Sequence, residues 1–212
     1  MNWLSNLERK YGRWCIPNLI SIIVGGQIFV YAVELFVNQY ISLYLNLNGA
    51  AILSGQIWRV LTFVFVPFSS GGPLSVILGI YFTWFVGSAL EREWGDFRFD
   101  LYILLGMLGA VLASLITGWA DTYCLSLSLL LAFAMLYPDV QLLLFFVIPL
   151  RVKYIGVFAA ALWVFSFLST SLMGKLNYLL CMLGFFVFFG PQAWHSLRAW
   201  IRREQWKRQN RR

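Results

Sequence analysis

Residues 101–120 read LYILLGMLGAVLASLITGWA, twenty consecutive residues without a charged side chain. A helix needs about 20 apolar residues to cross the hydrocarbon core of a bilayer. Small side chains recur along this stretch at helical spacing, which allows neighbouring helices to approach closely in lipid. They are Gly106, Gly109, Ala110, Ala113, Ser114 and Thr117. We therefore expect a membrane-spanning helix at the centre of a helical bundle.

The composition of the whole chain supports a membrane protein. Of 212 residues, 60% are hydrophobic and 12% are charged, against about 25% charged in ordinary soluble domains. This balance excludes a disordered chain, a disulfide scaffold and almost any soluble globule. The three cysteines (Cys15, Cys124 and Cys181) form no CxxC pair, so we expect free thiols. With a single histidine in the chain, we expect neither a metal site nor a cofactor.

Apolar runs divide the chain into six predicted spans, which make residues 16–190 an all-α membrane domain. The spans are residues 16–37, 74–90, 101–120, 122–137, 154–173 and 176–190. Two further apolar stretches, 60–68 and 140–150, are too short to cross, and we expect them to be interfacial or re-entrant.

Basic residues predict how this six-helix bundle is oriented. With the N-terminus inside, fourteen of the sixteen lysines and arginines fall on the cytoplasmic side, and only Arg59 and Lys175 fall outside. Cytoplasmic loops carry this excess in membrane proteins, so both termini are predicted to be cytoplasmic. Residues 1–15 form an amphipathic segment without a signal-cleavage site. Residues 191–212 form a basic tail that we expect on anionic lipid rather than on nucleic acid.

Polar side chains gather at the predicted outer ends of two spans. They include Tyr123, Ser126 and Ser128 in the fourth span and Asn177 in the sixth. Polar groups inside a bilayer need partners or water. One interpretation is a water-accessible pocket in the outer leaflet; the other is that the serines bond back to their own helix carbonyls. The sequence favours neither.

Two motifs in the predicted loops carry a family resemblance. Residues 55–63 read GQIWRVLTF, with Trp58 and Arg59, and residues 87–99 read GSALEREWGDFRF, followed by Tyr102. In order, spacing and topology they resemble motifs of the rhomboid superfamily, which implies a rhomboid-like fold. Its structural residues here are Trp58, Arg59, Gly87, Glu91, Gly95, Arg98 and Tyr102. Glu91 and Arg98 have opposite charges across a turn that Gly95 permits, so we expect them to pair.

The resemblance excludes the family's usual chemistry. Rhomboid proteases use a serine in a Gly-x-Ser-Gly box and a histidine in the sixth span. Residues 122–130 read TYCLSLSLL without glycine, and the only histidine, His195, follows the sixth span on the cytoplasmic side. Pro67 and Gly71 stand near where the family's oxyanion-stabilising residues lie. The chain thus resembles a Derlin-like pseudoprotease, which implies binding of transmembrane client helices for quality control or regulation.

Two alternative functions stay open from the sequence. An active serine protease would need Ser126 or Ser128 as nucleophile and Lys175 as the base. A transporter or channel component would use Glu34, the one acid within a predicted span. A bacterial cell membrane is the expected location, with the endoplasmic reticulum membrane as the alternative.

Overall fold

A computed structural model describes residues 9, 15–68, 72–120, 122–144 and 148–190. The predictions for most of residues 1–15, for Gly71, and for the tail with His195 fall outside these residues. Four described helices are long and apolar enough to cross a membrane: α2 (Leu19–Phe36), α6 (Pro73–Trp94), α7 (Asp96–Thr117) and α9 (Val152–Ser169). A fifth candidate is α10 (Leu172–Cys181) together with Leu183–Gly190, a pair bent by 58°. The chain is therefore an all-α protein with the helices of a multi-pass membrane protein.

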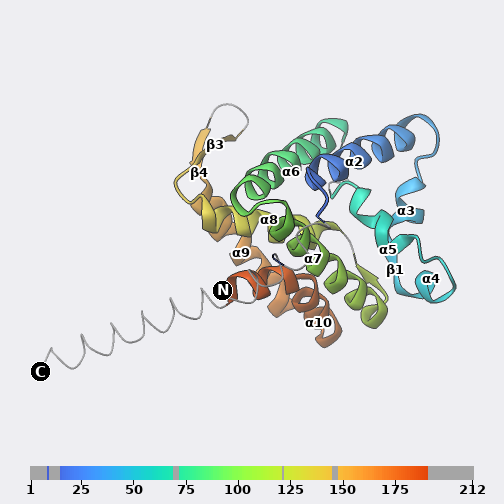
Figure 1. Ribbon diagram of the computed structural model, residues 1–212. Coiled ribbons are helices and arrows are strands. Elements are labelled where there is room, and N and C mark those ends of the chain that lie inside the picture. The colour runs from blue at the N-terminus through green and yellow to red at the C-terminus, as the bar shows by residue number, and fades with distance from the viewer. Residues whose placement is uncertain (1–8, 10–14, 69–71, 121, 145–147, 191–212) are drawn as a thin grey trace, which may run out of the picture.

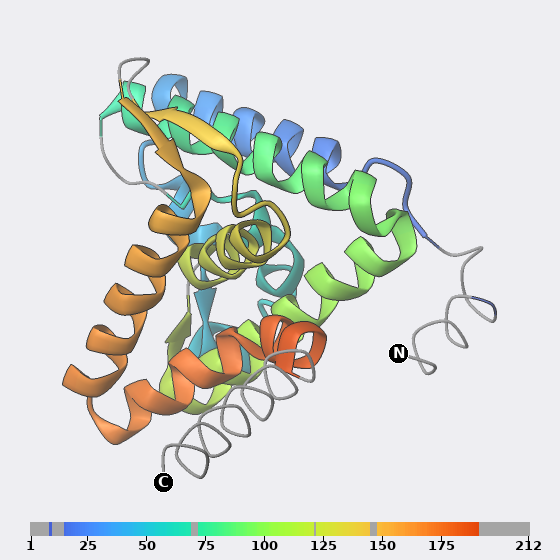
Figure 2. The ribbon, with the colours of Figure 1, turned by 90° about the vertical axis from the view of Figure 1, so that its left-hand side faces the viewer.

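Helix α8 (Thr122–Leu136) covers the predicted fourth span, residues 122–137, and is short. Its 15 residues extend about 22 Å, which is less than the roughly 30 Å of a hydrocarbon core. It contacts α6, α7, α9 and α10. Figure 2 shows it nearly end-on, enclosed by these helices. This short apolar helix is thus in the interior, where its neighbours cover it.

Small residues on α7 explain its close packing, as the sequence predicts. A Cβ atom added at Gly109 would overlap the backbone carbonyl of Leu180 on α10. From the other side, a Cβ at Gly184 would lie 3.0 Å from the carbonyl oxygen of Tyr102. Ala113 and Ser114 are fully buried on the same helix. In lipid, where packing replaces the hydrophobic effect, such backbone contact holds helices together.

The loop between α2 and α6 contains several short elements. They are α3 (Ile41–Leu45), β1 (Leu47–Asn48), α4 (Gly49–Leu53), α5 (Arg59–Thr62) and η2 (Phe63–Phe65). Strand β1 pairs antiparallel with β2 (Trp119–Ala120), Leu47 opposite Ala120. The predicted interfacial stretch 60–68 is thus helical up to Phe65, in turns too short to cross a membrane.

The predicted interfacial or re-entrant stretch 140–150 instead forms a hairpin. Strand β3 (Gln141–Leu144) pairs antiparallel with β4 (Ile148–Arg151), Gln141 opposite Arg151. Figure 1 shows this hairpin projecting beyond the helices, between α8 and α9. A short apolar run does not distinguish strand from helix by its periodicity. Pro149 disfavours the helical choice because it removes a hydrogen-bond donor.

Candidate functional site

The buried guanidinium of Arg59 holds the loop that follows α2. Its side chain is only 6% exposed. Nη1 donates to the carbonyl oxygens of Leu43 and Asn46, each at 2.8 Å, and Nε donates to Oε1 of Gln56 at 2.7 Å. Such charge-assisted bonds are stronger than neutral ones. The Trp-Arg motif therefore organises the loop, with Trp58 largely exposed beside it.

The same loop is tied to the helices on either side of it. The Thr122 hydroxyl, at the start of α8, donates to the Phe63 carbonyl at 2.7 Å. On α2, Nε2 of Gln27 donates to the Val64 carbonyl at 3.1 Å. These contacts fix the N-terminal end of α8, where the predicted pocket residues begin.

The glutamate of the second motif supports the N-terminus of α2. The buried Glu91 carboxylate accepts hydrogen bonds from the backbone N–H groups of Leu19 and Ile20. A carboxylate is stabilised there because the first N–H groups of a helix lack intrahelical partners and carry partial positive charge. The sequence predicts that Glu91 pairs with Arg98; the contact of the Glu91 carboxylate with the start of α2 is one that the sequence does not predict. Gly87 packs so closely on Ile20 that a Cβ would overlap its side chain.

Gly95 and Tyr102 shape the turn between α6 and α7. Gly95 has φ +79°, a conformation that glycine adopts without steric cost. The buried Tyr102 ring lies 5.2 Å from that of Trp94 and 5.3 Å from that of Phe188. Nearby, the Tyr137 hydroxyl donates to Glu93 at 2.9 Å. Together these contacts join the ends of α6, α7 and α8 to the segment Leu183–Gly190.

A polar cavity of about 370 Å³ lies at the end of α8 that these loops fix. Tyr123 of α8 and Asn177 of α10, both expected to line a pocket, line it. We call it the polar cavity; its other hydroxyl or thiol residues are Thr117, Cys124, Thr170, Ser171 and Tyr178. Asn177 Oδ1 accepts from Cys181 Sγ at 3.2 Å. The cavity offers several donors and acceptors between α7, α8 and α10.

A second hollow, the lateral groove, lies between α6, α8 and α9. Its volume is about 230 Å³. The lining is mainly apolar and includes Phe82, Val86, Phe158 and Leu162. Ser126, also expected in the pocket, is half-buried and lines this groove. Tyr123 lines both the lateral groove and the polar cavity, so the two hollows meet at one side chain.

The candidate nucleophiles and base lie apart from one another. Ser128 is 2% exposed, and its hydroxyl donates to the Leu125 carbonyl at 2.8 Å beside Tyr102. Ser128 therefore fits the interpretation in which a serine hydroxyl bonds back to a carbonyl of its own helix. Ser126 lies instead in the lateral groove. Lys175 is half-buried on α10 and is not among the described residues that line either hollow.

Glu34 contacts the loop that follows its helix. Its carboxylate accepts a hydrogen bond from the Ser42 hydroxyl at 2.8 Å. An acid near the end of a span can use such a bond to support a loop. Across the described ranges, no group of three histidine, cysteine, aspartate or glutamate side chains is placed to hold a metal ion.

The residues that sequence reasoning missed come from helix ends that are distant in the chain. Thr117 ends α7, Thr170 and Ser171 separate α9 from α10, and Cys124 opens α8. Single serines and threonines near helix ends are commonly caps; Ser171 indeed accepts from the Gly174 N–H. Only the packing of three helices shows that they share one cavity.

No protein-family model matches the chain, and no curated protein sequence matches it. The evidence on its function is therefore the chemistry and placement of its own residues.

Proposed function

We propose that the chain is a non-catalytic, rhomboid-like membrane protein that binds transmembrane helices of client proteins, in quality control or regulation. The observation that carries this proposal is the junction at Tyr123, where an apolar groove meets a polar cavity. A polar group on a client helix is costly in hydrocarbon unless it finds a partner. A client in the lateral groove would have apolar contact along its side and hydroxyl or amide partners in the polar cavity.

The proposed arrangement has six spans and cytoplasmic termini, in a bacterial cell membrane or, as the alternative, the endoplasmic reticulum membrane. In this arrangement α8 is counted as a short sixth span, beside the four long helices and the bent pair of α10 and Leu183–Gly190. The distribution of basic residues supports this orientation. The Trp-Arg loop and the Glu-Gly turn support the rhomboid-like assignment because Arg59, Glu91 and Tyr102 are buried at the points that join loop to helix, and Gly87 is closely packed there. The basic tail would rest on anionic lipid.

Binding of designed transmembrane peptides to the protein in lipid vesicles tests the proposal. One peptide is all leucine, and the other carries a single central asparagine; binding is measured by fluorescence energy transfer. An interhelical polar bond contributes about 0.6–1.4 kcal/mol in a bilayer, or roughly threefold to tenfold in affinity. We expect the asparagine peptide to bind more tightly by this factor.

Neighbouring alanines on α9 supply a matched pair of variants for this test. Ala159 lines the lateral groove, whereas Ala161 is exposed on the outside of α9. Ala159→Phe should fill the groove and abolish binding of the asparagine peptide, and Ala161→Phe should leave it unchanged. Equal binding of the two peptides, or equal behaviour of the two variants, would contradict the proposal.

A further inference from the structure

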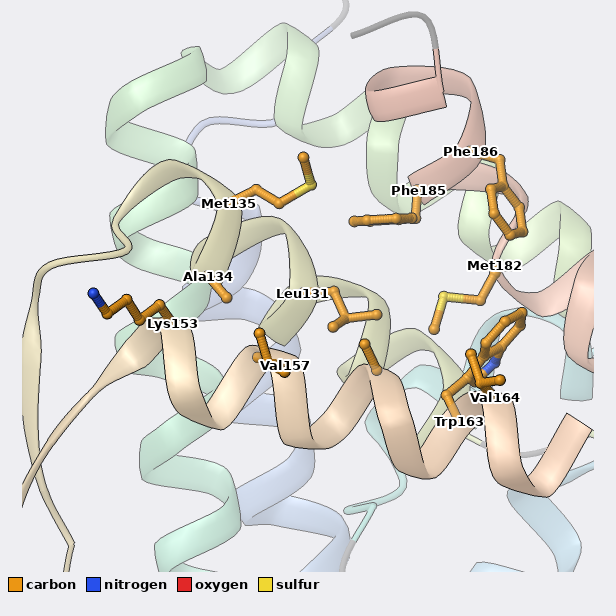
Figure 3. Close-up of a pocket in the computed structure, with 12 residues that line it drawn as sticks. Leu131, Ala134, Met135, Lys153, Val157, Trp163, Val164, Met182, Phe185 and Phe186 are labelled. Carbon is orange, nitrogen blue, oxygen red and sulfur yellow. The ribbon is translucent and has the colours of Figure 1, made fainter. Parts of the chain in front are cut away.

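A third hollow opens between α8, α9 and the segment Leu183–Gly190, away from the polar cavity. Its volume is about 400 Å³. Figure 3 shows Leu131 and Met135 of α8 facing it from one side and Phe185 and Phe186 from another, with α9 along its length. We call it the lysine groove, because Lys153 is the one charged side chain among its described lining residues.

The lysine groove exists because α9, although packed against α8, is covered by its neighbours over little of its length. Of the 18 residues of α9, only Val152 and Gly156 are buried. At Gly156 the two helices touch so closely that a Cβ would overlap the Ala134 side chain. Beyond this contact, Val157, Val164 and Phe186 remain exposed beside the groove. In a membrane, this apolar surface lies open to a molecule from the bilayer.

The charge at one end of the groove selects among such molecules. Lys153 is half-buried, so its stem covers apolar surface while its amine lies 5.2 Å from the centre of the Tyr154 ring. Lysine and tyrosine side chains place their polar tips at the membrane interface in this way. Arg151 is exposed two residues earlier. The open end of the groove therefore presents positive charge at the level of lipid headgroups.

The length of the groove suits one acyl chain. From Lys153 to Val164 the wall formed by α9 rises about 16 Å, close to one leaflet of a roughly 30 Å hydrocarbon core. The far end is closed by Trp163, whose ring contacts those of Phe167, Tyr178 and Phe186.

We propose that the lysine groove binds one anionic phospholipid, with an acyl chain along α9 and the phosphate at Lys153. This inference is independent of client binding in the lateral groove. Lipid held there would cover the gap between α9 and the C-terminal helix. It would thereby connect the most weakly packed long helix to the rest of the bundle.

Native mass spectrometry of the full-length protein, exchanged into phosphatidylglycerol or phosphatidylcholine with identical acyl chains, tests this proposal. An interfacial lysine contributes about 1 kcal/mol toward an anionic lipid, or roughly fivefold. We expect one phosphatidylglycerol molecule to be retained over phosphatidylcholine by this factor. Lys153→Gln should remove the preference, and Ala160→Phe, within the groove, should remove the retained lipid.

Three control variants separate this site from other lipid contacts. Lys175→Gln removes a lysine outside the groove, and Ala161→Phe adds the same ring on the exposed face of α9; both should retain the lipid. Ala159→Phe, which blocks the lateral groove, should also retain it. A preference that survives both Lys153→Gln and Ala160→Phe would overturn the proposal and place the lipid elsewhere, for example on the basic tail. If the lysine groove retained a transmembrane peptide in place of the lipid, that result would overturn the proposal as well.

Discussion

Replacement of Arg59 by leucine is expected to lower the free energy of unfolding by about 3–5 kcal/mol, because three acceptors lose their donor and an unpaired buried acceptor costs about 1–3 kcal/mol. The guanidinium makes three hydrogen bonds, two of them to carbonyl oxygens of the loop. Leucine satisfies none of these acceptors, and each unpaired buried acceptor is itself costly. Unfolding of the purified protein in mixed micelles, measured by denaturant titration, gives the value.

Two further substitutions show whether this effect comes from the shape of the arginine. Arg59→Lys keeps a charge but lacks the planar fork that reaches Leu43, Asn46 and Gln56 together, so an intermediate loss is expected. Arg92→Leu removes an exposed arginine on α6 and should change stability little. If Arg59→Leu were no more harmful than Arg92→Leu, the strand pair β1–β2 and not Arg59 would hold the loop.

Alanine at Gly109 is expected to destabilise the protein by about 1–3 kcal/mol, the usual cost of overpacking. The added methyl group would overlap the Leu180 carbonyl, which is backbone and cannot rotate away. Helices α7 and α10 would have to separate, and the polar cavity between them would change shape. The same denaturant titration measures the effect.

Gly25 provides the matched control for this substitution. It also lies inside a long helix, α2, but no atom lies within 4 Å of an added Cβ. Alanine there should be neutral or stabilising by up to about 1 kcal/mol, because glycine is the weaker helix former. Opposite signs at the two glycines are the expected result. Equal effects would show that α7 and α10 are not in backbone contact.

The sequence predicts the long helices well, because apolar runs of bilayer length rarely form any structure other than a membrane-spanning helix. It places α2, α6, α7 and α9 to within a few residues at most ends. It is less informative for the bent pair, since the break between Cys181 and Leu183 has neither proline nor a charge to mark it. It does not show the β3–β4 hairpin, because an apolar stretch of that length suits several structures.

The candidate site is only partly predictable, for a geometric reason. Ser126 and Ser128 are two residues apart on α8, and residues at that spacing point to different sides of a helix. One therefore lines the lateral groove while the other bonds to its own helix. Tyr123 and Asn177 are identifiable from their polarity within apolar runs. Thr117 and Thr170 are not, because only the packing of α7, α8 and α10 brings them to the same cavity.

Site-specific photo-crosslinking is the most direct test of client binding in the lateral groove. A photoreactive residue is placed at Leu162, which lines the groove, or at Leu168, an exposed leucine of α9 that does not. The asparagine-bearing peptide in lipid vesicles is the target, with the all-leucine peptide as the reference. We predict crosslinks from position 162 that favour the asparagine peptide and only background from position 168. Equal crosslinking from both positions would show that the peptide contacts α9 non-specifically, as surrounding lipid does. This result would contradict the client-binding account.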